Sequence, residues 1–192
     1  MSTVETASAK RTHLLATARR LFYRDGFRVV GIDTLLAEAQ VAKMTLYNHF
    51  ASKEELIVAV IEQLDQEVQA AVGAAVAAAG RSPAKRLAAV FGWLEEWFES
   101  DDFKGCAFIR ALSEYPEPAH PIHQAAWRHK RAINALLRTI AEDAEARHPA
   151  ELADALSLLL DGAILAAHAT GTSRPAVTAS TAASTLLKAA TA

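Results

Sequence analysis

The chain has 192 residues, of which 52% are hydrophobic and 22% are charged, and this composition excludes an intrinsically disordered protein. Its net charge of −2 hides an asymmetry, because residues 1–53 carry eight basic and four acidic side chains while residues 54–192 carry twelve and eighteen. A basic first quarter indicates that this end of the chain binds a polyanion. The lone cysteine, Cys106, excludes an intrachain disulfide. We expect it to be a small buried thiol, with a redox-sensing thiol as the alternative.

We expect a cytoplasmic protein with no membrane-spanning helix. The chain opens with no charged segment followed by an apolar run, so no signal peptide is predicted. The apolar run at residues 70–80 is shorter than the ~20 residues that cross a bilayer. The longer run at residues 156–169 is interrupted by Asp161 and His168.

The first quarter of the chain predicts three short helices. Apolar residues recur at helical spacing from Leu14 to Phe22, and Gly26 is expected to end this helix in a left-handed conformation. The second and third helices are expected over residues 32–39 and 42–49, joined by the turn AQV. Three helices of this length form a compact helix-turn-helix unit.

The segment SKEE begins a longer fourth helix with a capping box, in which Ser52 is the N-cap and Glu55 returns the hydrogen bond. The apolar pattern then continues to Gly80, which ends the helix. Five more helices are predicted after the breaks RSP, SDDFKG, EYPEPAHP, RHP and GTSRP, over approximately residues 83–99, 106–113, 122–147, 150–170 and 176–190. The sequence therefore predicts an all-α fold of about nine helices.

Three cations stand where they oppose a helix dipole. Lys53 is at the start of the fourth helix, and Lys10 and Arg11 are near the expected start of the first. Each costs roughly 0.3–1 kcal/mol at such a position, and a contact with a DNA phosphate would outweigh that cost. These cations therefore favour DNA as the polyanion.

The third helix has an outward face suited to a DNA groove. Leu46 and Phe50 are expected to face the interior of the unit. The side chains then left outside offer a cation, a phenol, an amide and a hydroxyl, which are the groups that contact phosphates and base edges. They belong to Lys43, Met44, Thr45, Tyr47, Asn48 and His49. Any one of them alone would be an ordinary surface residue, so the prediction rests on the whole set.

Residues 11–56, with LLATARRLFYRDGF, IDTLLAEAQVAKMTLYNHF and SKEEL, resemble the DNA-binding domain of tetracycline-repressor-type regulators, the TetR family. The resemblance implies a homodimer that binds a palindromic operator and releases it when a small molecule occupies the larger domain. It also implies a role for each residue of the outward face. Phosphates would be contacted by Lys43, Tyr47 and Lys53, base edges by Met44, Thr45 and Asn48, and the DNA backbone by His49.

Two residues depart from the pattern of the family. Gln40 stands where the turn glycine is usual, so a non-glycine residue is expected to adopt a positive φ. Ala42 replaces the common serine N-cap of the reading helix, which forgoes about 1 kcal/mol of capping. Both departures are expected to loosen the third helix without changing the fold.

We expect residues 1–52 to form the DNA-binding domain, with residues 1–8 as a disordered arm, and residues 53–192 to form a helical effector-binding and dimerisation domain. Many aromatic residues of the larger domain are expected to be ordinary core. The polar residues among them suit an apolar cavity with a few polar anchors. The residues expected to line this effector pocket are Trp97, Phe108, Leu112, Tyr115, His123 and Trp127.

The last two helices are expected to form the dimer interface. The helix over residues 150–170 is apolar on more than one face, as a helix buried both inward and against a partner would be. The last helix is rich in small residues, which permit close helix packing, and two helices from each subunit would make a four-helix interface. The expected contacts are Leu152, Leu156, Leu159, Ala163, Leu186 and Leu187. A monomer with an amphipathic tail is the alternative.

No catalytic residue, metal site or cofactor is expected. The spacing of His120, His123 and His129 does not fit a common zinc site. The chain contains no nucleophile elbow, glycine-rich phosphate loop or paired-carboxylate motif.

The sequence therefore predicts a ligand-responsive transcriptional repressor that binds a double-stranded DNA operator as a homodimer and is released by a small-molecule effector. Two alternatives stay open. One is an activator, or a regulator without an effector. The other, from a different class, is a helical small-molecule-binding protein or an enzyme whose basic end is incidental.

Overall fold

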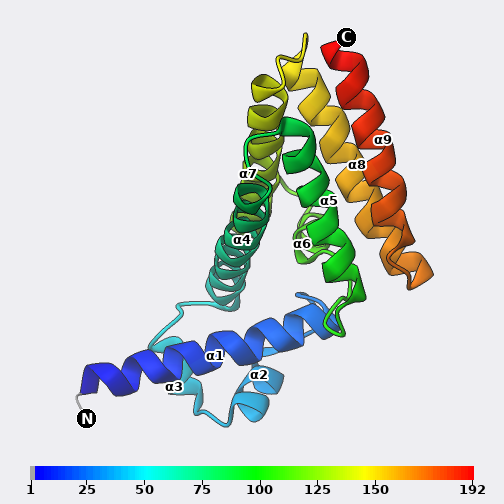
Figure 1. Ribbon diagram of the computed structural model, residues 1–192. Coiled ribbons are helices and arrows are strands. Elements are labelled where there is room, and N and C mark those ends of the chain that lie inside the picture. Colours follow the sequence, from blue (N-terminus) through cyan, green and yellow to red (C-terminus); the bar gives the residue numbers. More distant parts are fainter. Residues whose placement is uncertain (1–2) are drawn as a thin grey trace. The chain divides into compact units, whose positions relative to one another are not determined.

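The computed structural model describes residues 3–192, with side chains from Ala9 onward. The described residues form nine α-helices and no strand, which confirms the all-α fold (Figure 1). In chain order they are α1 (Thr3–Asp25), α2 (Ile32–Ala39), α3 (Lys43–Tyr47), α4 (Lys53–Ala78), α5 (Pro83–Glu99), α6 (Ala107–Glu114), α7 (Pro121–Asp143), α8 (Pro149–Thr170) and α9 (Arg174–Thr191).

Local signals explain several helix ends. Gly26 has a φ of 101° and its N–H donates to the carbonyl of Phe22 at 2.9 Å, which ends α1 as expected. The rings of Phe22 and Phe27 then pack with their centroids 5.6 Å apart. At the start of α5, the Ser82 hydroxyl accepts the N–H of Lys85 at 3.5 Å, directly before a proline at the first helical position.

The beginning of α1 differs from the sequence expectation. The helix starts at Thr3, so the residues expected to form a disordered arm are helical from Thr3 on, while residues 1 and 2 lie outside the described part of the chain. Lys10 and Arg11 are consequently about two turns inside the helix rather than at its start. The dipole argument for these two cations was therefore wrong, because the effect of the dipole falls off within the first turn.

The chain divides into two compact units. Unit 1 contains residues 1–65 and Ala107–Trp127, and unit 2 contains Gln66–Cys106 and Arg128–Ala192. Unit 1 thus combines the helix-turn-helix segment with α6 and the beginning of α7. The functional division expected at residue 52 stays a prediction.

The core of unit 1 joins α1, α2 and α3 to the first turns of α4. Its fully buried side chains include Leu14, Leu21, Phe22, Phe27, Leu35, Leu46, Phe50, Leu56 and Ile57. Two polar contacts at the edge of this core link α1 to α2. Arg20 pairs with Glu38 at 2.5 Å, and the His13 ring lies 2.9 Å from the carbonyl of Ala39.

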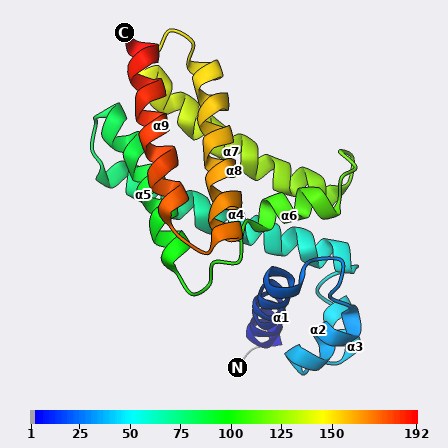
Figure 2. The same cartoon turned by 90° about the vertical axis from the view of Figure 1, so that its right-hand side faces the viewer.

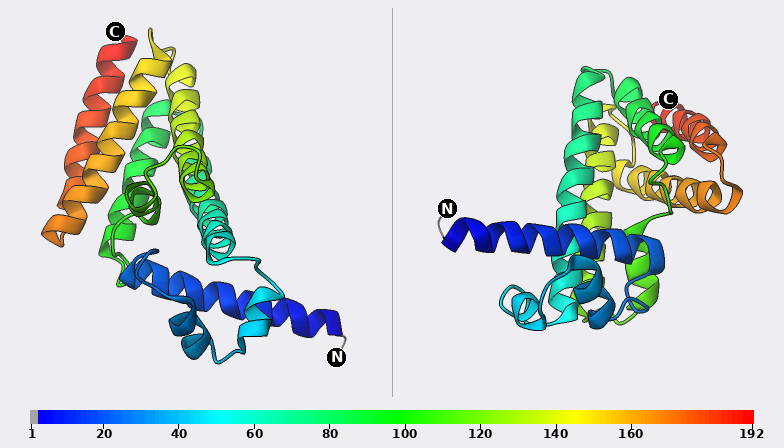
Figure 3. Two further views of the ribbon diagram at one scale, coloured as in Figure 1. Left: turned by 180° about the vertical axis from the view of Figure 1, so that it is seen from behind. Right: turned by 90° about the horizontal axis from the view of Figure 1, so that it is seen from below.

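Unit 2 is built around α5, α8 and α9, which pack against one another. Helices α8 and α9 lie side by side along their length in every view (Figures 2 and 3). The half-buried thiol of Cys106 packs against this core. Among the described helices, α8 alone is long and apolar enough to cross a membrane. This is weak evidence for a span, because the core helix of a globular domain has the same composition.

Candidate nucleic-acid interface

The turn between α2 and α3 has the geometry that the two unusual residues predicted. Gln40 is left-handed, with φ 52° and ψ 43°, and it ends α2. Its N–H donates to the carbonyl of Ala37 at 3.3 Å, and the N–H of Val41 donates to that of Leu36 at 3.2 Å. Ala42 is extended and its side chain makes no capping bond to α3. The positive φ expected at Gln40 is confirmed, and the loosening of α3 expected from both residues stays a prediction.

Helix α3 is held by a single buried residue and exposes most of its others. Leu46 has no solvent exposure, and Phe50, just beyond the helix, is 1% exposed. Met44 is 71% exposed and Tyr47 is 42% exposed. Lys43 and Asn48 are also exposed, whereas Thr45 and His49 are half-buried. Four of the six predicted residues, Lys43, Met44, Tyr47 and Asn48, are therefore exposed on or just after α3, whereas Thr45 and His49 are only partly exposed.

The side chains of this set lack partners within the described part of the chain. No hydrogen bond, ion pair or ring contact holds the side chains of Lys43, Tyr47 or Asn48 there. Lys10, on α1, is likewise exposed and unpaired among the described residues. Such groups are available to phosphates and base edges without breaking an internal bond.

Arg11 has a structural contact that sequence reasoning missed. Its guanidinium carbon lies 5.1 Å from the centre of the Phe50 ring, which is a cation–π contact between α1 and the end of α3. The two residues are far apart in the chain, so no local pattern could reveal this pairing. Arg11 therefore supports the position of α3, and its predicted contact with DNA stays a prediction.

Lys53 also has an internal partner. Its amine donates to the carbonyl of Arg28 at 3.1 Å, and burial lowers the pKa of the amine. The capping box forms in part, since Ser52 Oγ accepts the N–H of Glu55 at 3.1 Å. The Glu55 carboxylate accepts the N–H of Ala51 at 2.6 Å, one residue before the expected Ser52. Lys53 thus has a partner within the chain, so its position alone does not indicate DNA, and its phosphate contact stays a prediction.

Helix α6 is attached to the end of α1 by two charged side chains one turn apart. Arg110 donates to the carbonyls of Phe22 and Tyr23, at 3.4 and 2.9 Å, in the last turn of α1. Glu114 accepts the N–H groups of Phe27 and Arg28, at 3.2 and 2.6 Å. We call this pair, Arg110 and Glu114, the α6 clasp.

The α6 clasp requires a glycine in the loop that it holds. A Cβ at Gly26 would lie 2.9 Å from a carboxylate oxygen of Glu114, and the positive φ already disfavours other residues. In the same loop, the guanidinium of Arg28 lies 4.9 Å from the centre of the Tyr115 ring. Burial, together with the neighbouring Glu114 carboxylate, raises the pKa of the Tyr115 hydroxyl.

The six residues expected to line an effector pocket are divided between the units. Trp97 is in unit 2, where its ring stacks on Trp93 at 5.6 Å and meets the edge of Phe103 at 4.9 Å. The other five are in unit 1. There Phe108 and Tyr115 are buried, Leu112 and His123 are half-buried, and Trp127 is 51% exposed. The common pocket stays a prediction.

His123, the histidine of that expected pocket, makes its contact within unit 1. The His123 Nδ1 atom lies 2.8 Å from the carbonyl of Tyr115, and the His120 ring lies 4.7 Å from the Tyr115 ring. His120 Nδ1 also accepts the N–H of Ile122 at 3.2 Å. Within the described residues, no group of three histidine, cysteine or acidic side chains is placed to hold a metal ion.

The face of α8 and α9 that points outward differs from the predicted one. Four expected dimer contacts, Leu152, Leu156, Ala163 and Leu187, are buried in the core of unit 2 itself. Leu152, Leu156 and Leu187 therefore expose too little surface to contact a partner, which corrects the prediction for these three residues. Ala163 lines a groove on the surface, and its contact with a partner stays a prediction. Of the remaining two, Leu159 is half-buried and Leu186 is 38% exposed. The large apolar side chains left in solvent are instead Leu158, Leu165 and Val177, at 75%, 65% and 48% exposure.

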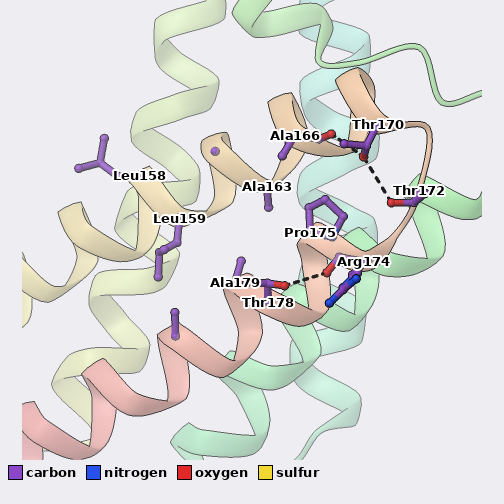
Figure 4. A pocket seen from close by; sticks show the side chains of 12 residues that line it. Leu158, Leu159, Ala163, Ala166, Thr170, Thr172, Arg174, Pro175, Thr178 and Ala179 are labelled. Carbon is purple, nitrogen blue, oxygen red and sulfur yellow. Dashed lines mark hydrogen bonds between the residues drawn. The ribbon is translucent and has the colours of Figure 1, made fainter.

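An apolar groove of about 430 Å³ follows this outward face between α8 and α9 (Figure 4). Leu158, Leu159 and Ala163 line it from α8, and Pro175 and Ala179 line it from α9. Its polar end contains Thr170, Thr172, Arg174 and Thr178. A leucine-bordered groove on an exposed helix pair is the kind of surface that packs against another protein.

Comparisons with known proteins agree with the geometry of unit 1. Residues 14–60 match the family described as "Bacterial regulatory proteins, tetR family". The whole chain is similar in structure to SCO4454, a TetR-family transcriptional regulator from Streptomyces coelicolor. The two are 33% identical with a TM-score of 0.90, over 96% of this chain and 97% of that one. The chain belongs to the TetR family.

Curated TetR-family relatives extend the similarity beyond the DNA-binding segment. The HTH-type transcriptional regulator YjdC of Escherichia coli is 24% identical over 155 residues, which cover 81% of each chain. The HTH-type transcriptional repressor NemR of Escherichia coli is 26% identical over 139 residues, which cover 72% of this chain and 70% of NemR. TetR-family members are DNA-binding transcriptional regulators and not enzymes, so the enzyme alternative no longer applies.

Proposed function

We propose that this TetR-family regulator is a repressor that binds a palindromic operator in the cytoplasm as a homodimer and releases it on binding a small-molecule effector. The observation that carries the proposal is the outward side of α3. There Lys43, Tyr47 and Asn48 are exposed and form no internal bond among the described residues. In a helix-turn-helix protein, such side chains enter the major groove of duplex DNA.

The homodimer is supported by the outward face of α8 and α9. Leu158 and Leu165, two turns apart, leave a large apolar area in water, and the groove beside them has room for side chains of a second copy. A two-fold dimer brings the same face together from both subunits. To enter successive major grooves, the two α3 helices of the dimer must lie about 34–36 Å apart.

The coupling to an effector is supported by two helices, α4 and α6, whose side chains bond the loop that follows α1. Helix α4 continues from unit 1 into unit 2 and begins at Lys53, which bonds the loop after α1. The α6 clasp bonds the same loop and the end of α1. An effector that shifted α4 or α6 would alter the loop. Changed hydrogen exchange at Phe27 and Arg28 on effector binding would report this, and unchanged exchange would count against it.

The test of the proposed function is the substitution Tyr47→Ala. Genomic DNA fragments that the wild-type protein retains would first be selected, and the affinity of each variant for a retained duplex measured by mobility shift. Loss of a phosphate hydrogen bond and of a groove contact should weaken binding about tenfold or more. Tyr47→Phe, which keeps the ring, is the matched control and should lose less. Intact binding by Tyr47→Ala would contradict the reading face.

A further inference from the structure

The side chains on and just after α3 differ in how far they project from unit 1 toward a DNA groove. Asn48 follows the last residue of α3 but keeps a helical backbone, with φ −71° and ψ −18°. Successive residues of an α-helix are about 100° apart, so Met44 and Asn48 lie close to the line directly opposite the buried Leu46. Lys43 and Tyr47 lie on one flank of that line, where both are exposed. On the other flank, Thr45 and His49 are half-buried. Met44 and Asn48 therefore project farthest from unit 1.

The chemistry of these two side chains selects among base pairs. A carboxamide such as that of Asn48 can pair with both N6 and N7 of adenine, and an apolar group such as the Met44 thioether can pack on the 5-methyl group of thymine. Guanine is read mainly by arginine or lysine, and cytosine by acidic side chains. Residues 43–49 contain no arginine, aspartate or glutamate.

Lys43 is the one residue of α3 suited to guanine. It lies on the flank with Tyr47 rather than on the central line, and a cation on a flank of the helix faces the phosphates that border the groove. The central line thus offers one amide and one apolar group, with the cation beside them.

We propose that each α3 reads A·T pairs at the centre of its half-site, with Asn48 on an adenine and Met44 on a thymine methyl group. The inference rests on the proposed operator binding and specifies which bases the operator presents. The two residues are one turn apart, about 6 Å along the helix, and base pairs stack every 3.4 Å or so. The two contacts therefore fall within about two base steps of each other.

Base analogues test the pairing one atom at a time. In a duplex that the wild-type protein retains from genomic DNA, each thymine is replaced by uracil, which lacks the methyl group. Each adenine is replaced in turn by 7-deazaadenine, which lacks the N7 acceptor. One uracil position per half-site should weaken binding about fourfold, as expected for a buried methyl group. One 7-deazaadenine position should weaken it about tenfold, as expected for losing part of a bidentate contact.

Two variants assign each effect to its residue and serve as controls for each other. In Met44→Ala, the uracil effect should vanish while the 7-deazaadenine effect remains, and in Asn48→Ala the reverse should hold. Both side chains are exposed, so the variants should fold as the wild type does, which thermal unfolding checks.

Three outcomes would overturn the inference. In the first, retained duplexes have no sensitive A·T position. In the second, the analogue effects persist unchanged in both variants. In the third, the sensitive positions are G·C pairs whose effect is removed by Lys43→Ala. A failure to retain any DNA would contradict the proposed function itself, whereas these three outcomes leave that function standing.

Discussion

The outward face of α3 and the outward face of α8 and α9 are both exposed to solvent, but their side chains differ in chemistry. On α3 the exposed groups are a cation, a phenol, an amide and a thioether. On α8 and α9 they are mainly leucine, valine and small residues beside a groove. Polar groups are well solvated by water when no DNA is bound. Apolar surface, by contrast, gains about 25 cal/mol of stabilisation for each Å² that a partner removes from water. The first face suits a transient partner, and the second suits a permanent one.

The largest effect is expected from making the α8–α9 face charged. The double substitution Leu158→Glu and Leu165→Glu should convert the dimer to a monomer, because it places like charges opposite each other across a two-fold interface. Operator affinity should then fall about a hundredfold or more, since the two half-sites no longer bind as one linked unit. Light scattering during gel filtration measures the mass, and mobility shift measures the affinity.

A charge placed elsewhere on unit 2 is the control for that experiment. Ala135 is exposed on α7, and Ala135→Glu should leave both the mass and the affinity unchanged. A double variant that remained a dimer would show that the exposed leucines serve another purpose.

The second prediction separates the buried face of α8 from the exposed one. Leu156 has no solvent exposure, so Leu156→Ala should lower the free energy of unfolding by about 2–5 kcal/mol and leave the association constant of the folded subunits unchanged. Leu158→Ala should instead weaken association. Urea unfolding measures the first quantity, and sedimentation equilibrium measures the second. A variant Leu156→Ala that dissociated while remaining equally stable would restore Leu156 to the interface.

The smallest effect concerns the start of α3. Ala42 already has the extended backbone of an N-cap but supplies no side-chain acceptor. Ala42→Ser should therefore stabilise the folded protein by about 0.5–1 kcal/mol in urea unfolding. The same change in the interior of α2, Ala37→Ser, should destabilise it slightly, because serine is the poorer helix former. Stabilisation of equal size by both would show that capping is not the cause.

The amino-acid sequence by itself determined the number of helices and most of their ends, and the exposure of Lys43, Met44, Tyr47 and Asn48. Gly26, Gln40 and the Ser82–Pro83 pair act on backbone groups a few residues away, so their effects can be inferred from the local pattern. The burial of Leu46 and Phe50 was predicted because these two large apolar residues stand one helical turn apart, and both are buried. Such signals need no knowledge of the rest of the chain.

Only the tertiary structure decided which distant groups meet. It placed Lys53 on the carbonyl of Arg28 and Arg11 on the ring of Phe50. It also turned Leu156 inward and Leu158 outward on a helix that is apolar on several sides. Periodicity gives the spacing of such residues but not the direction of the core, because that direction is set by helices packing from elsewhere in the chain.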